Sequence, residues 1–257
     1  MEATKNSLAI ILKRQAYREK DSLVSVYTAA WGKLSLLARG TQRLGSKLAG
    51  HIEPLSLVNL MIVRGKGLDY VGSAINSKVF LSIRQDLNKL YYAGEAISIF
   101  NRLVKDNQAD SDLFYLLEEY LEALDIFPEA ILTNCLPANL PKDKGELFLA
   151  GFVWRLLKLL GYQPELRFCL ACRAPLAPGL NYFDFLSGGV VCTNCLENQR
   201  KIMTFSAANF LVVSDNCLKA VRFLIANEPR TFAKLVLSLK VTKELSLLTK
   251  SFLKFCD

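Results

Sequence analysis

The sequence is poor in the side chains on which hydrolytic and phosphoryl-transfer enzymes depend. His51 is the only histidine among 257 residues, and a lone histidine more often makes a structural hydrogen bond than acts as a catalytic base. No G-x-x-x-x-G-K-[ST] phosphate loop is present, so ATP hydrolysis by that route is not expected. The acidic residues of the first third are too few and too scattered to suggest a two-metal nuclease site. These absences favour a binding protein over an enzyme.

Long hydrophobic runs are also missing. No apolar stretch reaches the length of about 18 residues that a membrane helix needs. The most apolar helical segment, residues 147–160, contains Arg155 and Lys158. The N-terminal stretch MEATKNSLAIILKRQ does not have the pattern of a secretory signal. We therefore expect a cytoplasmic protein that has no membrane partner.

Positive charge is abundant, and it is concentrated at the start of the chain. Of the formal net charge of +8, residues 1–79 contribute +7, from 12 basic and five acidic residues. Residues 80–257 contribute only +1, from 20 basic and 19 acidic residues. One reading is that the basic residues merely keep a small β domain solvated. The stronger reading is a basic domain that binds a polyanion, joined to a near-neutral domain.

The first 79 residues have the pattern of a small β-barrel. Alternating or β-branched apolar segments are separated by turns rich in glycine and basic residues. A glycine-rich loop over residues 39–51 interrupts them after the third segment. An OB-fold has five strands and suits that interruption, and an SH3-like barrel is the alternative. The expected strands are Leu8–Leu12, Leu23–Thr28, Lys33–Ala38, Leu55–Val63 and Leu68–Ile75.

Residues 80–257 have a helical pattern. We expect one helix over Ile83–Val104, a second that begins at an N-terminal cap in Asp110–Asp112, and a central buried helix over Gly145–Leu160. The pattern is again helical from Ser206 to Phe255. The predicted fold class is therefore α+β, with an N-terminal OB-fold barrel over residues 1–79 and a helical domain over residues 80–257.

The cysteines give the most specific motif. Cys169, Cys172, Cys192 and Cys195 form C-x2-C-x19-C-x2-C, a spacing typical of four-thiolate zinc sites. With all four positions supplied by protein, such a Zn²⁺ ion is structural. Two disulfides or an iron–sulfur cluster are the alternatives. We expect a zinc ribbon at about residues 165–199, inserted in the helical domain. The remaining cysteines, which we interpret as small core residues, are Cys135, Cys217 and Cys256.

Taken together, these motifs resemble those of the RecO family of bacterial DNA repair proteins. Their order and spacing carry the resemblance more than any one of them, and it is stronger in the first half of the chain than in the last 60 residues. The matching segments are Tyr17–Leu23, Tyr27–Thr28, Trp31–Leu34, Ala38–Gly40, Leu48–Leu55, Arg64–Leu68, and Phe183–Asp184 with Ser187–Gly189 between the two cysteine pairs.

The resemblance implies a recombination mediator without catalytic turnover or a small-molecule substrate. Such a protein binds single- and double-stranded DNA and anneals complementary strands. It works with RecR, contacts the C-terminal tail of the single-stranded-DNA-binding protein SSB, and helps RecA to displace SSB. It is cytoplasmic and associated with the nucleoid. Some family members lack the cysteine quartet, so the zinc prediction rests on the residues of this sequence.

An OB barrel binds a nucleic-acid strand through a cationic groove and stacking aromatic rings. Arg39 and Arg43 are the first choices, because a glycine-rich loop lets the backbone approach a phosphate closely. The available aromatic residues are Tyr17, Tyr27, Trp31 and Tyr70, for each of which burial in the barrel core is the more common alternative. The candidate cations are Lys13, Arg14, Arg18, Lys33, Arg39, Arg43, Lys47, Arg64 and Lys66.

The helical domain is expected to make the protein contacts. An acidic, hydrophobic SSB tail needs an apolar pocket rimmed by cations, for which the candidates are Arg102, Lys105, Arg155, Lys158, Arg222 and Lys234.

Two other classes of function compete with a DNA-binding mediator. A transcription- or translation-associated factor also combines zinc ribbons with OB-folds, and it predicts a preference for RNA or a polymerase. A nuclease with a zinc ribbon predicts metal-dependent cleavage, for which the chain has no carboxylate or histidine cluster.

Overall fold

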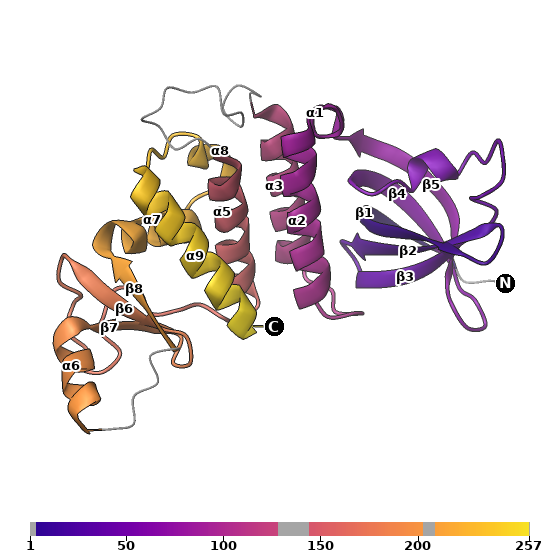
Figure 1. Cartoon of the computed structure of the whole chain (residues 1–257). Coiled ribbons are helices and arrows are strands. Elements are labelled where there is room, and N and C mark those ends of the chain that lie inside the picture. Colours follow the sequence, from indigo (N-terminus) through magenta and orange to yellow (C-terminus); the bar gives the residue numbers. More distant parts are fainter. Residues whose placement is uncertain (1–3, 128–143, 203–208, 257) are drawn as a thin grey trace. The chain divides into compact units, whose positions relative to one another are not determined.

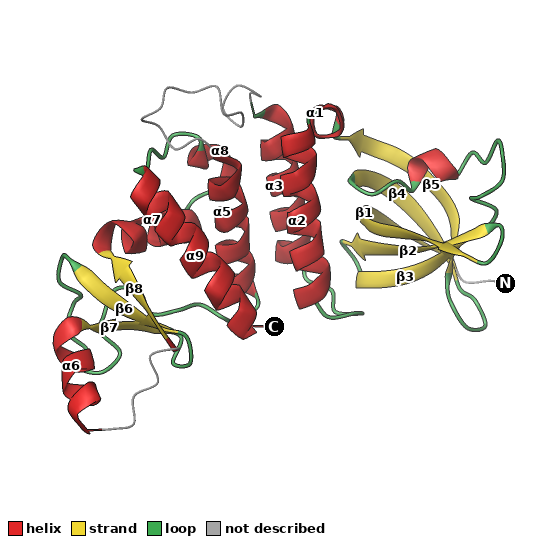
Figure 2. Cartoon of the chain, viewed as in Figure 1, coloured by secondary structure: helices red, strands yellow, loops and turns green. Residues whose placement is uncertain are grey.

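The protein is an α+β chain of two compact units, Met1–Phe127 and Pro128–Asp257. The structure is a computed structural model that describes residues 4–127, 144–202 and 209–256. The first unit runs from indigo to magenta in Figure 1 and the second from red to yellow. Figure 2 shows strands and helices in both units. The predicted fold class is confirmed.

Five strands at the start of the chain close into a barrel. The order around the barrel is β1-β2-β3-β5-β4, and β1 pairs with both β2 and β4. Neighbouring strands are antiparallel except β3 and β5, which are parallel. This order and the long connection before β4 are those of an OB-fold, so the predicted barrel is confirmed. The strands are β1 (Thr4–Tyr17), β2 (Asp21–Thr28), β3 (Gly32–Ala38), β4 (Ser56–Val63) and β5 (Tyr70–Val79).

The first strand contains a β-bulge. Between Ile11 and Lys13, β1 advances by two residues while β2 advances by one, so Leu12 is the extra residue. A bulge of this kind changes which side chains face the barrel interior. After it, Lys13 is exposed on the outer surface, and the side chain of Arg14 is only 16% exposed.

Alternate side chains of the strands fill the barrel interior. Ile52 and Leu48 of the β3–β4 connection add to this core from one end. The connection contains the short 3-10 helix η1 (Ala49–His51). The buried cluster consists of Ala9, Ile11, Val24, Val26, Leu36, Ala38, Ile52, Val58, Leu60, Ile62, Val71 and Ala74.

Helices follow the barrel within the first unit. The single helix predicted over Ile83–Val104 is wrong, because the backbone is extended at Asp86. The Asp86 side chain accepts hydrogen bonds from the backbone N–H groups of Asn88 and Lys89, so a new helix starts there. The helices are α1 (Leu81–Gln85), α2 (Leu87–Leu103) and α3 (Ser111–Ile126).

The barrel and these helices are joined through β2 and β3. The predicted cap of α3 is confirmed, because Asp110 accepts hydrogen bonds from the backbone of Asp112 and Leu113. The buried Tyr27 hydroxyl donates to the Asp110 carbonyl at 3.1 Å. The Tyr27 ring meets Phe100 of α2 edge-on, with centroids 4.9 Å apart. The barrel and α1–α3 therefore form one packed unit.

The second unit is built around a buried helix, as predicted for Gly145–Leu160. Trp154 of this helix is fully buried, and its Nε1 donates to Thr249 Oγ1 at 2.9 Å. Its ring stacks on Phe252, with centroids 5.4 Å apart. The helices of this unit's bundle are α5 (Lys144–Leu159), α7 (Asp215–Ala226), α8 (Pro229–Phe232) and α9 (Leu239–Cys256).

A three-stranded sheet packs on this bundle. Its order is β7-β6-β8, and buried Phe183 of β6 contacts the rings of Trp154 and Phe252. The helical pattern predicted over Ser206–Phe255 is wrong at residues 210–214, which pair along β6 as a strand. Residues 206–208 lie outside the described residues. The elements are β6 (Leu180–Asp184), β7 (Gly189–Cys192), α6 (Thr193–Ile202) and β8 (Phe210–Ser214).

Within the described ranges, no helix has both the length and the apolar character that crossing a bilayer requires.

Substitution of Gly32 should loosen the barrel from its helices. Gly32 has φ of +70°, and a Cβ atom there would lie 2.0 Å from the Gln108 carbonyl oxygen. We expect Gly32→Ala to lower the free energy of unfolding by about 3 kcal/mol or more, because backbone strain and a backbone clash combine. Gly45→Ala is the matched control, since Gly45 has φ of +78° with no atom within 4 Å of its Cβ position. Its expected cost is about 1 kcal/mol. Equal costs in urea denaturation would contradict the packing.

Candidate nucleic-acid interface and metal centre

The outer surface of β1, β2 and β3 presents a polar face beside the end of α2. The register sets Lys13 of β1, Ser25 of β2 and Ser35 of β3 side by side. Gln15 and Leu23 form the next rung of the same face. We call the outer surface formed by these residues and Lys33 the strand face. The strand face therefore offers hydrogen-bonding side chains along three neighbouring strands.

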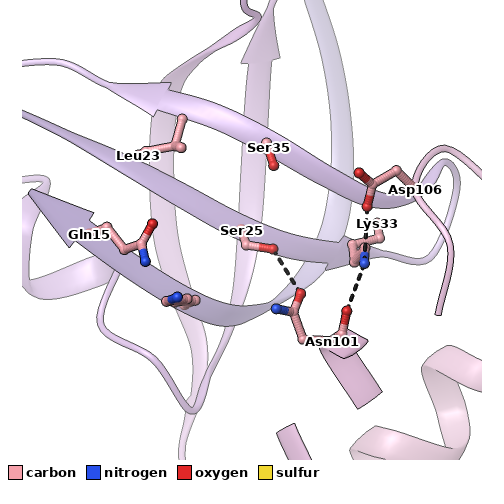
Figure 3. A pocket seen from close by; sticks show the side chains of 8 residues that line it. Gln15, Leu23, Ser25, Lys33, Ser35, Asn101 and Asp106 are labelled. Atoms are coloured by element: carbon pink, nitrogen blue, oxygen red, sulfur yellow. Dashed lines mark hydrogen bonds and ion pairs between the residues drawn. The ribbon is translucent and has the colours of Figure 1, made fainter. Parts of the chain in front are cut away.

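A hollow of about 240 Å³ lies on the strand face. Asn101 of α2 and Asp106 form its wall opposite the strands (Figure 3). Ser25 Oγ donates to Asn101 Oδ1 at 3.3 Å, which places the amide over the strands. The lining is mostly polar, with Lys13, Gln15 and Ser35 contributing hydrogen-bonding groups. This chemistry suits a phosphate or sugar better than an apolar ligand.

Two of the nine candidate cations have strong internal partners. Lys33 Nζ donates to the Asn101 carbonyl at 2.8 Å and lies 3.0 Å from Asp106 Oδ1, and its side chain is 14% exposed. Arg14 pairs with Glu53 and donates to the carbonyls of Thr41 and Ala49 and to Ser22 Oγ. Lys33 thus links the barrel to the end of α2, and Arg14 ties down the β3–β4 connection.

The remaining candidate cations are exposed. Apart from Lys13, they lie in connections between strands or directly after them. Backbone hydrogen bonds bring three of these connections together: Gln42 N–H donates to the Lys20 carbonyl, and Leu37 N–H, near the end of β3, donates to the Asp69 carbonyl of the β4–β5 turn. The β1–β2 turn, the start of the β3–β4 connection and the β4–β5 turn therefore meet at one end of the barrel, which we call the loop end. The exposed cations are Lys13, Arg18, Arg39, Arg43, Lys47, Arg64 and Lys66.

The aromatic candidates differ in exposure. Tyr27 is fully buried, and burial with the nearby Asp110 carboxylate raises its pKa to about 12. Trp31 packs against the barrel core, and Lys5 lies over its ring. Tyr70 is half-buried, and the Arg39 guanidinium lies 4.2 Å from its ring centroid. Tyr17 is also half-buried beneath Arg18. Tyr27 is therefore buried, whereas Tyr17 and Tyr70 are half-buried at the loop end.

Several residues of the candidate interface were not predicted from sequence. Gln15, Ser25 and Ser35 lie on the strand face only because of strand register, and Asn101 reaches it from a helix some 70 residues later. Lys20, an exposed cation of the β1–β2 turn, was also missed. The carboxylate of neighbouring Asp21 accepts a hydrogen bond from Gly40 N–H at 2.8 Å. The excess of basic residues in the first third of the sequence, to which Lys20 belongs, was the signal that could have identified it.

The four cysteines of the double C-x2-C motif converge. Their Sγ atoms all lie within 4.8 Å of one another, and a tetrahedral ion bound at about 2.3 Å would hold sulfurs about 3.8 Å apart. None of the six described cysteines forms a disulfide. The site comprises Cys169, Cys172, Cys192 and Cys195. It fits a structural metal ion with four thiolate ligands.

Local backbone structure presents these sulfurs. Residues 167–176 form a tight hairpin in which Phe168 pairs with Pro175 and Arg173 has φ of +60°. Cys192 ends β7, and its N–H donates to Cys169 Sγ at 3.3 Å. Burial opposes ionisation of the Cys169 thiol, but backbone N–H groups outweigh it and lower its pKa to about 6. Such N–H···S contacts orient a metal-binding thiolate.

Among the described residues, the other predicted ones do not form a second metal site. His51 Nδ1 accepts from Asn76 N–H at 3.3 Å, a structural bond between the β3–β4 connection and β5. Cys217 is buried, Cys256 is half-buried, and Cys135 lies outside the described residues. The six candidate cations for an acidic tail are divided between the units. Arg102 and Lys105 belong to the first unit, and Arg155, Lys158, Arg222 and Lys234 to the second.

Known proteins resemble this chain over nearly its whole length. Residues 1–79 match the family model for the N-terminal part of recombination protein O, and residues 84–255 match the model for its C-terminal part. A DNA repair protein RecO of Dehalococcoides mccartyi is 29% identical over 247 residues, covering 96% of this chain and 88% of that protein. One from an Anaeromyxobacter species is 32% identical over 225 residues, covering 86% and 81%. One from a Roseiflexus species is 30% identical over 246 residues, covering 96% and 78%.

Substitutions at positions 13 and 14 should differ in their effect on stability, because the two side chains lie on opposite sides of β1. We expect Arg14→Met to lower the free energy of unfolding by about 2 kcal/mol, because it leaves Glu53 and the carbonyls of Thr41 and Ala49 without their charged donor. Lys13→Met should change stability by less than about 0.5 kcal/mol, since Lys13 is exposed. Urea denaturation of both variants tests this. A larger loss for Lys13→Met would contradict the bulged register.

Proposed function

The chain belongs to the recombination protein O family, whose role is in DNA repair and recombination, and we propose that it acts as a mediator without catalytic turnover. In this proposal it binds single- and double-stranded DNA and anneals complementary strands. Together with RecR it helps to load RecA onto DNA coated by SSB.

The observation that carries this proposal is the polar strand face that leads to a cationic loop end. OB-folds bind oligonucleotides on the face of strands 2 and 3 and with the loops between strands 1 and 2 and strands 4 and 5. In this barrel, those positions hold Arg18 in the first turn and Arg64 and Lys66 in the second. We assign DNA binding to residues 1–79.

The exposed cations divide into two groups by their surroundings. Lys13 stands in the hollow of the strand face, where Ser25, Ser35 and Gln15 can bind the sugar–phosphate chain. Arg39 and Arg43 stand at the loop end, where Arg39 covers the ring of Tyr70. Phosphate contacts of this kind position a strand without reading its bases. We expect weak sequence preference, and bases left free to pair with a second strand.

The helical domain, residues 80–257, is assigned to protein contacts. Lys158 and Lys234 are exposed in the second unit of the chain, and Arg222 lies 3.5 Å from Asp215. An acidic SSB tail would be bound by exposed cations next to apolar side chains. RecR and RecA are proposed as partners from the family alone.

We further propose that the four-cysteine site holds one structural Zn²⁺ ion. Cys169, Val191 and Leu196 are the buried core of the ribbon, with Leu170 and Leu176 packed against it. So small a core cannot hold the hairpin and β7 together unaided, and metal binding of this type contributes about 10 kcal/mol or more to local folding. The ribbon is assigned to about residues 165–199.

Removing two loop-end cations tests the DNA interface. We expect Arg39→Gln with Arg43→Gln to weaken single-stranded DNA binding roughly 20-fold at 0.1 M salt and to reduce the salt slope by about 1.4, because two phosphate contacts are lost. Lys5→Gln with Lys78→Gln is the control, with equal charge removed from the same barrel. Fluorescence anisotropy across a salt series gives both quantities.

If both variants lost DNA affinity equally, the loss would follow from net charge alone, and the assigned interface would be contradicted. A clear preference of the wild-type protein for RNA would instead favour a transcription- or translation-associated factor. The same titration with an RNA oligonucleotide provides that comparison.

Replacing cysteines tests the metal site. We expect about one zinc ion per wild-type chain by elemental analysis, and loss of it in the Cys169→Ser, Cys192→Ser variant. That variant should become sensitive to proteolysis in the ribbon, while thermal unfolding of the barrel unit stays unchanged. The buried Cys217→Ser is the control and should keep its zinc. Iron in place of zinc, with visible absorbance, would show a cluster site instead.

A further inference from the structure

The last helix carries a stripe of exposed lysines. Along α9, residues 240, 243, 247, 250 and 254 follow each other by three or four positions, so they share one face of the helix. All five side chains are exposed. Four of them are lysines, and the central one is Leu247, which is 53% exposed. We call Lys240, Lys243, Lys250 and Lys254 the lysine stripe.

The stripe is separated from the packed face of the helix. The opposite face of α9 is buried in the second unit, with Leu245, Leu248 and Phe252 in its core. In Figure 1, α9 is the long yellow helix beside α5, and the two pack together. The lysine stripe thus faces outward on a helix whose opposite face is packed in the core of its unit.

Acidic residues near the stripe neutralise little of it. Glu244, the only acidic residue of α9, accepts hydrogen bonds from the backbone N–H and side chain of Ser214. Lys250 Nζ lies 3.6 Å from Glu146 Oε1, but its side chain is 68% exposed. Exposed pairs of this kind contribute little.

One end of the stripe runs against the electrostatics of its own helix, whereas Lys254 in the last turn is placed favourably. The first turn of α9 has no acidic residue and includes Lys240. A cation at a helix N-terminus is unfavourable, because the helix dipole is positive there. A local rule broken without a compensating contact is typical of functional surfaces. The arrangement therefore indicates an anionic partner.

We propose that the lysine stripe binds the phosphate backbone of a second DNA strand during annealing. The inference rests on the proposed function, since it assumes that the barrel holds the first strand. From Lys240 to Lys254 the stripe is roughly 21 Å long, enough for a row of consecutive phosphates of one strand. A continuous strand of phosphates fits this row better than a compact anion.

A second DNA-binding surface, on the second unit, would let one chain bind two strands at once. The barrel and α9 belong to different compact units, so one chain can bind two strands without competition at one surface. Holding both strands raises their effective concentration for pairing. A membrane fits less well, because the apolar face that would insert is buried in the bundle.

The test uses the full-length chain with two strands that cannot pair, homothymidine and homocytidine oligonucleotides with different dyes. Energy transfer between the dyes reports both strands on one molecule. We expect Lys243→Gln with Lys250→Gln to weaken binding of the second strand roughly 20-fold at 0.1 M salt, through two lost phosphate contacts. Binding of the first strand should change by less than twofold, and annealing of complementary strands should slow.

Two controls accompany the stripe variant. Lys219→Gln with Arg230→Gln removes the same charge from exposed positions elsewhere in the second unit and should leave energy transfer unchanged. Lys243→Arg with Lys250→Arg keeps the charge and should retain second-strand binding.

The outcomes separate this inference from the proposed function. Normal second-strand binding by the stripe variant, with weak first-strand binding by the loop-end variant, overturns the inference alone. Normal first-strand binding by the loop-end variant overturns the barrel assignment instead. A stripe variant that keeps both strands but loses binding to anionic lipid vesicles, or to an acidic peptide, also overturns the inference.

Discussion

The bulge at Leu12 decides which cations of the barrel face solvent. Without it, Lys13 would stand opposite Val24 and point inward, and Arg14 would lie on the outer surface. With it, Arg14 closes the inner end of the β3–β4 connection through Glu53 and backbone carbonyls. The same shift sets Lys13 and Gln15 on the strand face. One extra residue thus produces both the anchored connection and the polar face beside it.

The second constraint is the contact of β2 and β3 with the helices. Gly32 leaves room for the Gln108 carbonyl, and Tyr27 and Lys33 reach across to the residues around α2. Because the Lys33 ammonium group takes part in these contacts, it is not available as a free cation. In return they hold Asn101 and Asp106 over the strands, so the hollow is shaped by two elements. Asp106 in the lining of this hollow repels an anion there, so we place the proposed phosphate contacts mainly at the loop end.

The sequence allowed the elements with short-range signals to be predicted. Five alternating strands, the cap at Asp110 and the double C-x2-C motif are local patterns, and the structure has each of them. The break at Asp86 and the strand Phe210–Ser214 were missed. The first is a capping residue inside an otherwise helical period, and the second is a β-branched run that pairs only because β6 offers an edge. Asn101 could not be placed on the strand face, because long-range packing has no short-range signal.

The sequence predicts the net charge of each segment, but the effect of that charge depends on which face of a helix or barrel carries the charged side chains. Residues 80–257 have a net charge of only +1, which hides a helix whose lysines share one face while its single acid is turned to Ser214. The barrel shows the opposite case, since two of its candidate cations serve internal contacts. Annealing requires two polyanions to approach each other, and their mutual repulsion is the main obstacle. In the proposed annealing role, cations on two separate units would lower that repulsion on both strands, and contacts limited to phosphates would leave the bases free to pair.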